Sequence, residues 1–200
     1  MGKTVFFGGT FNPPHLAHRL MLEAAAKCKN IDKILVVPTN IPPHKEISGF
    51  CASGEDRLNM CQLLCKGIDI CEVSDMELLR GGKSYSYDTL CILKEQYNDL
   101  QLLIGGDMIT TFDTWFNYKE ILKIAEILAV RRPGIDNEAF DNSVDFMRNL
   151  GGIVKVIDAE MLDISSTIIR ECLENGEFSK LIDYLPNNIY EYIRENNLYR

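Results

Sequence analysis

The segment GGTFNPPHLAH, residues 8–18, constrains the fold of this chain most strongly, because it joins a predicted strand to a predicted helix. A β-branched and aromatic run at residues 4–7 precedes it, and an Ala- and Leu-rich stretch at residues 16–27 follows it. We expect Gly8 and Gly9 to adopt backbone angles closed to other residues and to let a phosphate approach main-chain N–H groups. Turns of this kind, at a helix N-terminus, bind phosphates in open α/β proteins.

Two histidines, His15 and His18, lie in this turn with a spacing of three residues. If the helix begins near Pro14, both side chains lie on one face, beside the partly positive helix N-terminus. A pair of helical histidines without such a context more often only covers surface. The glycine turn before this pair favours another interpretation, in which both histidines are neutral or cationic donors to an anion.

The rest of the chain predicts an alternation of strands and helices. Five further apolar runs have the length and the aliphatic content of buried strands. Strands that alternate with helices indicate a doubly wound parallel sheet with right-handed crossovers, so the predicted fold class is α/β. The predicted strands are residues 33–37, 69–73, 100–104, 124–130 and 153–157, and predicted helices include 54–66, 84–97 and 187–196.

Composition limits the class of protein. A length of 200 residues with 46% hydrophobic content suits one domain with a full core. The formal net charge of −8 argues against a nucleic-acid partner, because backbone phosphates require clustered Lys and Arg. The longest apolar runs fall far short of the ~18 residues that a membrane span needs, and no basic leader with an apolar core begins the chain. We therefore expect a cytoplasmic protein with no membrane partner.

The seven cysteines include no CxxC pair, and an odd number cannot pair completely within one chain. Cys61 and Cys65 fall four residues apart on a predicted helix, where a metal or redox pair is conceivable. Small core residues explain this spacing better, because cysteine without a partner is often buried. We expect reduced thiols and assign no metal ligand.

A second motif, ISSTIIR at residues 164–170, predicts another anion site at a helix N-terminus. Ser165 is a plausible helix cap, and the hydroxyls of Ser166 and Thr167 lie beside backbone N–H groups that have no helical partner. Arg170 follows one turn later, within reach of a phosphate held there. An ordinary serine cap with a solvated arginine is the alternative, and the presence of the first motif disfavours it.

Polar and basic residues after other predicted strands add to this picture. Gly105 and Asp107 follow the strand at 100–104, where an acidic side chain suits a ribose hydroxyl or, equally, a helix cap. A bound phosphate in an acidic protein needs a local basic pocket. Besides the two histidines and Arg170, the candidates beside turn-like segments are Lys45 and Arg131.

Together, the two motifs resemble the nucleotidyltransferase superfamily of α/β proteins, and within it the bacterial nicotinate-mononucleotide adenylyltransferases. The resemblance extends over essentially the whole chain and implies a Rossmann-like nucleotidyltransferase fold in a single domain, with a helical C-terminal portion at about residues 165–200. Further matching pieces are PPHK at 42–45, DRLNM at 56–60, KSYSYDTL at 83–90, IGGDM at 104–108, Trp115 and RRPG at 131–134.

The resemblance implies a reaction in which ATP and nicotinate mononucleotide, assisted by Mg²⁺, give nicotinate adenine dinucleotide and pyrophosphate. It implies catalytic roles for His15, His18 and Arg170. The ATP site then comprises these three residues with Gly8, Gly9, Thr10, Phe11, Gly105, Asp107, Ile164, Ser165, Ser166 and Thr167. The mononucleotide site comprises Asn40, Lys45, Ser86 and Trp115, with Lys45 near the phosphate and the Trp115 ring stacked on the pyridine, although Trp115 also suits core packing.

Two departures from the family pattern leave the choice between acid and amide substrates open. Ser86 stands where threonine is expected, and Phe116 stands where a polar or tyrosine-like residue is expected. Pantetheine-phosphate adenylyltransferases are rivals, but they typically carry threonine in place of His15. Cytidylyltransferases usually have a different C-terminal signature, and a nucleotide-sensing module would more naturally have lost one of the phosphate-binding side chains. Homo-oligomerisation stays open.

Overall fold

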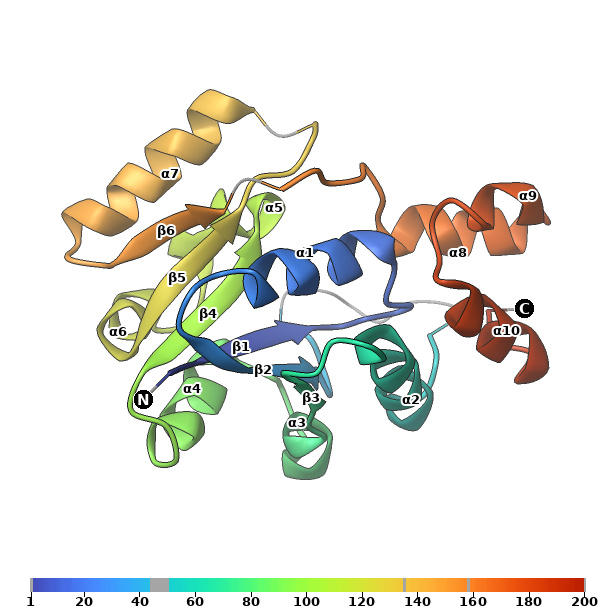
Figure 1. Cartoon of the computed structure of the whole chain (residues 1–200), viewed down its shortest axis with the longest axis horizontal. Helices are drawn as coiled ribbons and strands as arrows, with labels where there is room; N and C mark the ends of the chain where they lie inside the picture. Colours follow the sequence, from blue (N-terminus) through green and yellow to red (C-terminus); the bar gives the residue numbers. More distant parts are fainter. Residues whose placement is uncertain (1, 44–50, 135, 158, 200) are drawn as a thin grey trace.

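The computed structural model describes residues 2–43, 51–134, 136–157 and 159–199 of the chain. Six parallel strands form one sheet in the order β3-β2-β1-β4-β5-β6 (Figure 1). The strand order reverses between β1 and β4, and open α/β sheets bind ligands at such a point, beyond the carboxyl ends of the strands. The strands are β1 (Lys3–Gly9), β2 (Ile31–Pro38), β3 (Cys71–Val73), β4 (Leu100–Gly105), β5 (Ala125–Val130) and β6 (Val154–Ile157).

Helices cover both faces of the sheet, as the predicted doubly wound fold requires (Figure 1). Neighbouring residues on β1 show how, because side chains of a strand alternate between faces. Val5 and Phe7 pack with α1, α2, α8 and α10, whereas Phe6 packs with α4, α6 and α7. The helices are α1 (Leu16–Ala26), α2 (Gly54–Cys65), α3 (Met76–Arg80), α4 (Ser86–Lys94), α5 (Gly106–Ile109), the 3-10 turn η1 (Phe112–Thr114), α6 (Tyr118–Ile124), α7 (Asn137–Asn149), α8 (Ser166–Glu174), α9 (Phe178–Leu181) and α10 (Asn187–Glu195).

Most predicted elements are present, and the differences lie at their ends. Strand β3 begins at Cys71 and not at residue 69, because the preceding residues form the turn after α2. Helix α4 begins at Ser86 and not at Ser84, because the Ser84 N–H donates to the Ile41 carbonyl oxygen at 2.8 Å. Ser165 caps α8 as predicted, with its Oγ accepting from the Ile168 N–H at 3.3 Å.

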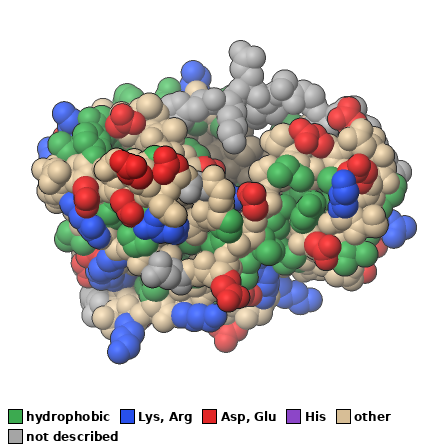
Figure 2. Space-filling model, turned by 90° about the horizontal axis from the view of Figure 1, so that it is seen from above, with side chains coloured by type: hydrophobic (Ala, Val, Ile, Leu, Met, Phe, Trp, Pro, Cys, Tyr) green, Lys and Arg blue, Asp and Glu red, His purple; other side chains and the backbone are tan. Residues whose placement is uncertain are grey.

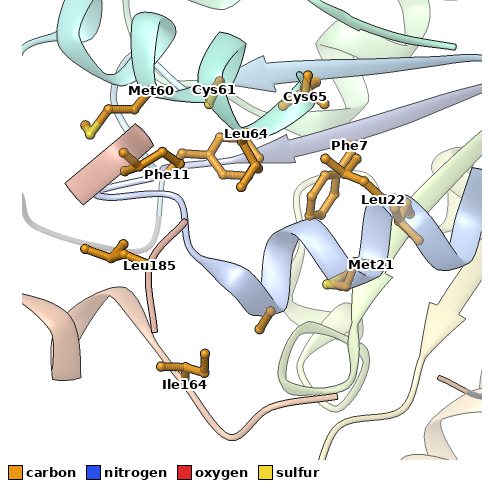
Figure 3. Packing of buried hydrophobic residues seen from close by; sticks show 14 of the residues in the cluster. Phe7, Phe11, Met21, Leu22, Met60, Cys61, Leu64, Cys65, Ile164 and Leu185 are labelled. Carbon is orange, nitrogen blue, oxygen red and sulfur yellow. The ribbon is translucent and has the colours of Figure 1, made fainter. Parts of the chain in front are cut away.

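The core on the α1 side of the sheet reaches the turn after β1. Figure 3 shows Phe7 and Phe11 among apolar side chains of α1 and α2, with Cys61 and Cys65 in the same cluster. Both cysteines are buried, which confirms the prediction that they serve as small core residues. None of the described helices is long and apolar enough to cross a membrane.

Candidate active site

A cleft of about 230 Å³ opens beyond the carboxyl ends of β1 and β4, where the strand order reverses. Ten of the predicted site residues line it: Gly8, Gly9, Thr10, Phe11, His18, Ser86, Gly105, Asp107, Trp115 and Ser166. On the face of the molecule in Figure 2, Lys and Arg side chains are interspersed with Asp and Glu and form no continuous basic surface. Within the cleft, Arg132 is the one Lys or Arg side chain among the described residues that line it.

The glycines of the first motif line the cleft, but the prediction that they need backbone angles closed to other residues is wrong. Neither Gly8 nor Gly9 has a positive φ, and the left-handed backbone lies at Phe11, with a φ of 49°. A Cβ at Gly9 would lie 2.9 Å from the Phe11 ring, and one at Gly8 would lie 2.7 Å from the Phe6 ring. The glycines thus make room for aromatic rings under the turn. Phe11 in turn packs edge-on against His18, with ring centroids 5.0 Å apart.

The two histidines meet, and helix α1 begins at Leu16, the start of the stretch predicted to be helical. His15 is the N-cap residue in an extended conformation. The His15 N–H donates to His18 Nδ1 at 3.2 Å, and the two imidazole rings stack. Because Nδ1 of His18 accepts this hydrogen bond, a neutral His18 carries its proton on Nε2. His18 lines the cleft.

His15 differs from its neighbour in environment. Its side chain is 3% exposed, and burial, with a further contribution from the Arg132 charge, lowers the pKa of His15 to about 3. His15 is therefore neutral at physiological pH, which is one of the two forms that the sequence left open. Its Nδ1 is buried and has no hydrogen-bond partner among the described residues. The His15 ring stacks on the His18 ring, and His15 does not line the cleft.

The second motif is attached directly to the first. Ser166 Oγ donates to the Pro13 carbonyl oxygen at 2.9 Å, and Arg170 Nη1 donates to the Asn12 carbonyl oxygen at 2.7 Å. Arg170 Nη2 lies 3.3 Å from Thr167 Oγ1. These contacts join residues more than 150 positions apart, with sequence separations of 153 and 158. The start of α8 and the turn that leads into α1 are therefore in direct contact, and of the second motif Ser166 lines the cleft.

Asp107 and Arg132 form a pair at the end of β4. Asp107 lies in the first turn of α5, and its Oδ1 is 3.2 Å from Arg132 Nη1. Arg132 Nη2 also donates to the Ile164 carbonyl oxygen at 2.5 Å. A Cβ at Gly105 would lie 3.0 Å from Asp107 Oδ1 and 3.3 Å from Arg132 Cδ, so glycine permits this close approach. Ile164 itself is a core residue that does not line the cleft, and its carbonyl oxygen holds Arg132.

The two neighbouring arginines of RRPG have different surroundings. Arg131, the residue proposed from the sequence, donates to Asp141 at 2.6 Å and to Asn137 at 2.9 Å, both on α7. Its guanidinium also lies over the Phe140 ring. Consecutive side chains at a strand end point to opposite sides, so Arg132 reaches the cleft and Arg131 does not. The prediction of Arg131 for a phosphate pocket is wrong in this respect.

Among the residues predicted for an acceptor, Ser86 and Trp115 line the cleft. The indole Nε1 of Trp115 is buried and has no partner in the described part of the chain, and its ring centroid is 5.4 Å from that of Phe112. Asn40 does not line the cleft. Its N–H donates to Ser84 Oγ at 2.9 Å and its Nδ2 to the Gly82 carbonyl oxygen at 3.1 Å. Lys45 lies outside the described residues.

No group of three or more His, Cys, Asp and Glu side chains in the described ranges is arranged to hold a metal ion. Two carboxylates line the cleft in the described part of the chain: Asp107 is paired with Arg132, and Glu77 accepts from Thr89.

Sequence comparisons place this geometry in a known family. A family model described as cytidylyltransferase-like matches residues 6–172. A probable nicotinate-nucleotide adenylyltransferase from Listeria monocytogenes serotype 4b is 40% identical over 200 residues, covering 98% of this chain and 97% of the relative. The chain belongs to the nicotinate-nucleotide adenylyltransferase family. Another relative with this description, from Oceanobacillus iheyensis, is 38% identical over 201 residues and covers 100% of this chain and 97% of its own length.

Solved structures agree with the nicotinate-nucleotide adenylyltransferase fold. The structure of Plasmodium falciparum nicotinic acid mononucleotide adenylyltransferase complexed with NaAD matches with a TM-score of 0.81 and 19% identity, covering 100% of this chain and 98% of that chain. The same protein complexed with APC matches with a TM-score of 0.80. At this identity the likeness concerns the fold, and it confirms the Rossmann-like nucleotidyltransferase fold predicted from the sequence.

Sequence reasoning missed several residues of this family member's cleft. Arg132 is one, and the RRPG match was the signal that could have identified it. Tyr85 and Phe116 form an aromatic wall with ring centroids 4.8 Å apart, and both line the cleft. Glu77 also lines it, 1% exposed, and its Oε1 accepts from Thr89 Oγ1 at 2.5 Å. Burial raises the pKa of this carboxyl, and no local pattern around residue 77 marks it as part of a site.

Proposed function

We propose that this protein transfers the adenylyl group of ATP to nicotinate mononucleotide, forming nicotinate adenine dinucleotide and pyrophosphate. The observation that carries this proposal is the attachment of Arg170 and Ser166 to the backbone of Asn12 and Pro13. It brings two anion-binding helix N-termini to one cleft, as an extended triphosphate requires. The full-length similarity to nicotinate-nucleotide adenylyltransferases supports the identity of the acceptor.

The chemistry needs no general base. A phosphate oxygen of the mononucleotide is already ionised, since the second pKa of a phosphate monoester is about 6. This oxygen attacks the α-phosphorus of ATP, the bond from that phosphorus to the bridging oxygen of the β-phosphate breaks, and pyrophosphate leaves with the electron pair. Catalysis then depends on positioning and on stabilisation of the charge that develops on the transferring and leaving groups.

The residues at the phosphate end take roles that follow from their contacts. His18 donates from Nε2 to an ATP phosphate. The negative charge on that phosphate grows in the transition state, so this hydrogen bond becomes stronger there. His15, held neutral, fixes the position of His18 through its backbone N–H. Main-chain N–H groups near Thr10 and Phe11 add donors. Arg170 uses two of its N–H groups to donate to Asn12 and Thr167, and its other N–H groups bind the β- and γ-phosphates. Ser165, Ser166 and Thr167 bind the same phosphates.

The remaining residues bind the rest of the two nucleotides. Asp107 accepts from an ATP ribose hydroxyl with the carboxylate that Arg132 orients. Trp115 stacks on the pyridine ring, and the Ser86 hydroxyl and N–H bind the nicotinate carboxylate, which favours the acid over the amide. The Lys45 ammonium group binds the mononucleotide phosphate. Asn40 acts through its contact with Ser84, which keeps the end of β2 beside the segment that leads into α4.

We further propose that Mg²⁺ enters as a complex with ATP. Mg²⁺ retains several waters and binds readily to substrate phosphates, and the described residues offer it no cluster of ligands. We also propose that the protein is cytoplasmic. Its seven cysteines, all of which the structure describes, are free, and free thiols are typical of the reducing cytoplasm, where ATP is available.

The proposal is tested by pyrophosphate release from Mg·ATP with different acceptors under identical conditions. We expect rapid release with nicotinate mononucleotide, slower release with nicotinamide mononucleotide, and none with phosphopantetheine or without an acceptor. Release with phosphopantetheine alone would instead support a pantetheine-phosphate adenylyltransferase. ATP binding without release for any acceptor would support a nucleotide-sensing protein.

A further inference from the structure

The C-terminal end of the chain makes a buried contact with the phosphate-binding turn. The hydroxyl of Tyr199 donates to Asn12 Oδ1 at 2.8 Å, across a sequence separation of 187 residues. Tyr199 is 6% exposed and Asn12 is 8% exposed. Figure 1 shows α8, α9 and α10 gathered at the end of the sheet where β1 leads into α1, which explains how the two residues meet. Neither residue lines the cleft.

Asn12 is a point where several parts of the site join. Its Oδ1 also accepts from the Ala52 N–H at 3.1 Å, just before α2. Its carbonyl oxygen accepts from Arg170 Nη1 at 2.7 Å. The next residue, Pro13, accepts from Ser166 Oγ. A shift of Asn12 therefore moves the Arg170 guanidinium and changes the distance between the two motifs.

Tyr199 is held firmly in place to make this contact. Tyr199 adopts a left-handed backbone conformation, with a φ of 62°, which is unfavourable for an aromatic residue unless surrounding contacts enforce it. The Leu198 N–H donates to the Ile193 carbonyl oxygen at 3.0 Å and closes the end of α10. Burial raises the pKa of the Tyr199 hydroxyl, so this group stays protonated and remains a donor.

We propose that Tyr199 is a positioning residue for ATP, acting through Asn12 on the phosphate-binding turn and on Arg170. The C-terminal segment is thus part of the ATP half of the site, whereas the residues that bind the acceptor lie on the segments around α4 and η1. This inference rests on the proposed adenylyl transfer for its kinetic consequence, and it also predicts a change in ATP binding that needs no turnover.

The test compares Tyr199→Phe with Tyr192→Phe in the full-length protein. Tyr192 is the matched control, because its hydroxyl, on α10, donates to Asp56 Oδ1 at 3.0 Å on α2 and makes no contact with Asn12. Each substitution removes one hydroxyl and keeps the ring. We expect Tyr199→Phe to raise the KM for ATP about fivefold, which corresponds to the ~1 kcal/mol of a typical hydrogen bond. The KM for nicotinate mononucleotide should stay within about twofold.

The control separates positioning from general stability. Tyr199→Phe loses one hydrogen bond and Tyr192→Phe loses two, so both should lower the melting temperature, but Tyr192→Phe should leave the KM for ATP unchanged. Unchanged ATP parameters in Tyr199→Phe, or equal effects on ATP and mononucleotide, or equal effects in both variants, would overturn the inference.

Calorimetric titration with ATP alone keeps this test independent of the proposed reaction. The dissociation constant for ATP should rise about fivefold in Tyr199→Phe and should not change in Tyr192→Phe. If the wild-type protein binds ATP but makes no dinucleotide, the proposed function fails, and the titration still decides whether Tyr199 positions the ATP site.

Discussion

The imidazole rings of His15 and His18 stack with their centroids 3.7 Å apart and an angle of 27° between their planes. One ring is buried and neutral, and the other lines the cleft with its Nδ1 occupied by the His15 N–H. The pair therefore does not consist of two equivalent cations. It consists of one residue that lines the cleft and one buried residue whose N–H donates to it, which is the arrangement that the proposed roles require.

Replacing His18 by alanine tests the role of this donor. We expect kcat to fall by about 10²–10³, the usual cost of removing one donor to a developing oxyanion, while the KM for nicotinate mononucleotide changes little. Steady-state kinetics with each substrate varied in turn measures both parameters. A large rise in the KM values with an unchanged kcat would instead show that His18 binds the substrate and the transition state equally strongly.

The low pKa of His15 predicts a specific pH dependence of stability. Folding keeps His15 neutral with a pKa of about 3, whereas the unfolded chain has the ordinary value of 6.5, so the unfolded state binds more protons between these values. The contribution of His15 to the free energy of unfolding is therefore complete above pH 6.5 and decreases as the pH falls below this value. From pH 7 to pH 5, protonation of His15 in the unfolded state should lower the free energy of unfolding by roughly 2 kcal/mol.

The variant His15→Asn does not titrate and should lose this part of the pH dependence. Urea unfolding at pH 7 and pH 5, with wild type and variant side by side, measures the difference. Parallel pH dependences in the two proteins would mean that His15 takes up its proton in the folded state at an ordinary pKa.

The adjacent arginines provide a matched pair of variants. Arg132→Ala removes the partner of Asp107 and a donor to the Ile164 carbonyl oxygen. We expect kcat/KM for ATP to fall about tenfold or more, because hydrogen bonds of charged groups contribute roughly 1.5–3 kcal/mol. Arg131→Ala breaks an ion pair with the exposed carboxylate of Asp141, so the same parameter should stay within about twofold. Equal losses in both variants would contradict the assignment of Arg132 to the ATP site.

Trp115 is the only tryptophan of the chain, so its fluorescence reports on the acceptor end of the cleft. Stacking on a pyridine ring should quench this fluorescence when nicotinate mononucleotide is added, and ATP alone should quench it less. A titration measured on wild type, with Trp115→Phe as the blank, gives the affinity. A signal that does not respond to the mononucleotide would favour a packing role for Trp115.

The fold followed from the sequence because strand and helix patterns are local. The run at 100–104 predicted β4 within one residue, and Ser165 was recognisable from the sequence as the cap of α8. The two motifs were also visible, since each combines turn chemistry with a helix start. These features depend on neighbours in the chain and need no knowledge of tertiary contacts.

The remaining features depend on contacts between distant segments. The burial that keeps His15 neutral and the face of the strand end that turns Arg132 into the cleft are properties of the packed structure. The buried carboxyl of Glu77 and the contact from Tyr199 to Asn12 lie even further from any local pattern. The sequence therefore identified the segments of the site more reliably than the task of each side chain.

The fate of the oxygen atoms in the mononucleotide phosphate tests the central claim most directly. Nicotinate mononucleotide labelled with ¹⁸O in its phosphate is incubated with Mg·ATP and the wild-type protein, and both products are analysed by mass spectrometry. Direct attack on the α-phosphorus predicts that nicotinate adenine dinucleotide carries all of the label and pyrophosphate carries none. Labelled pyrophosphate, or the absence of a labelled dinucleotide, would contradict this account.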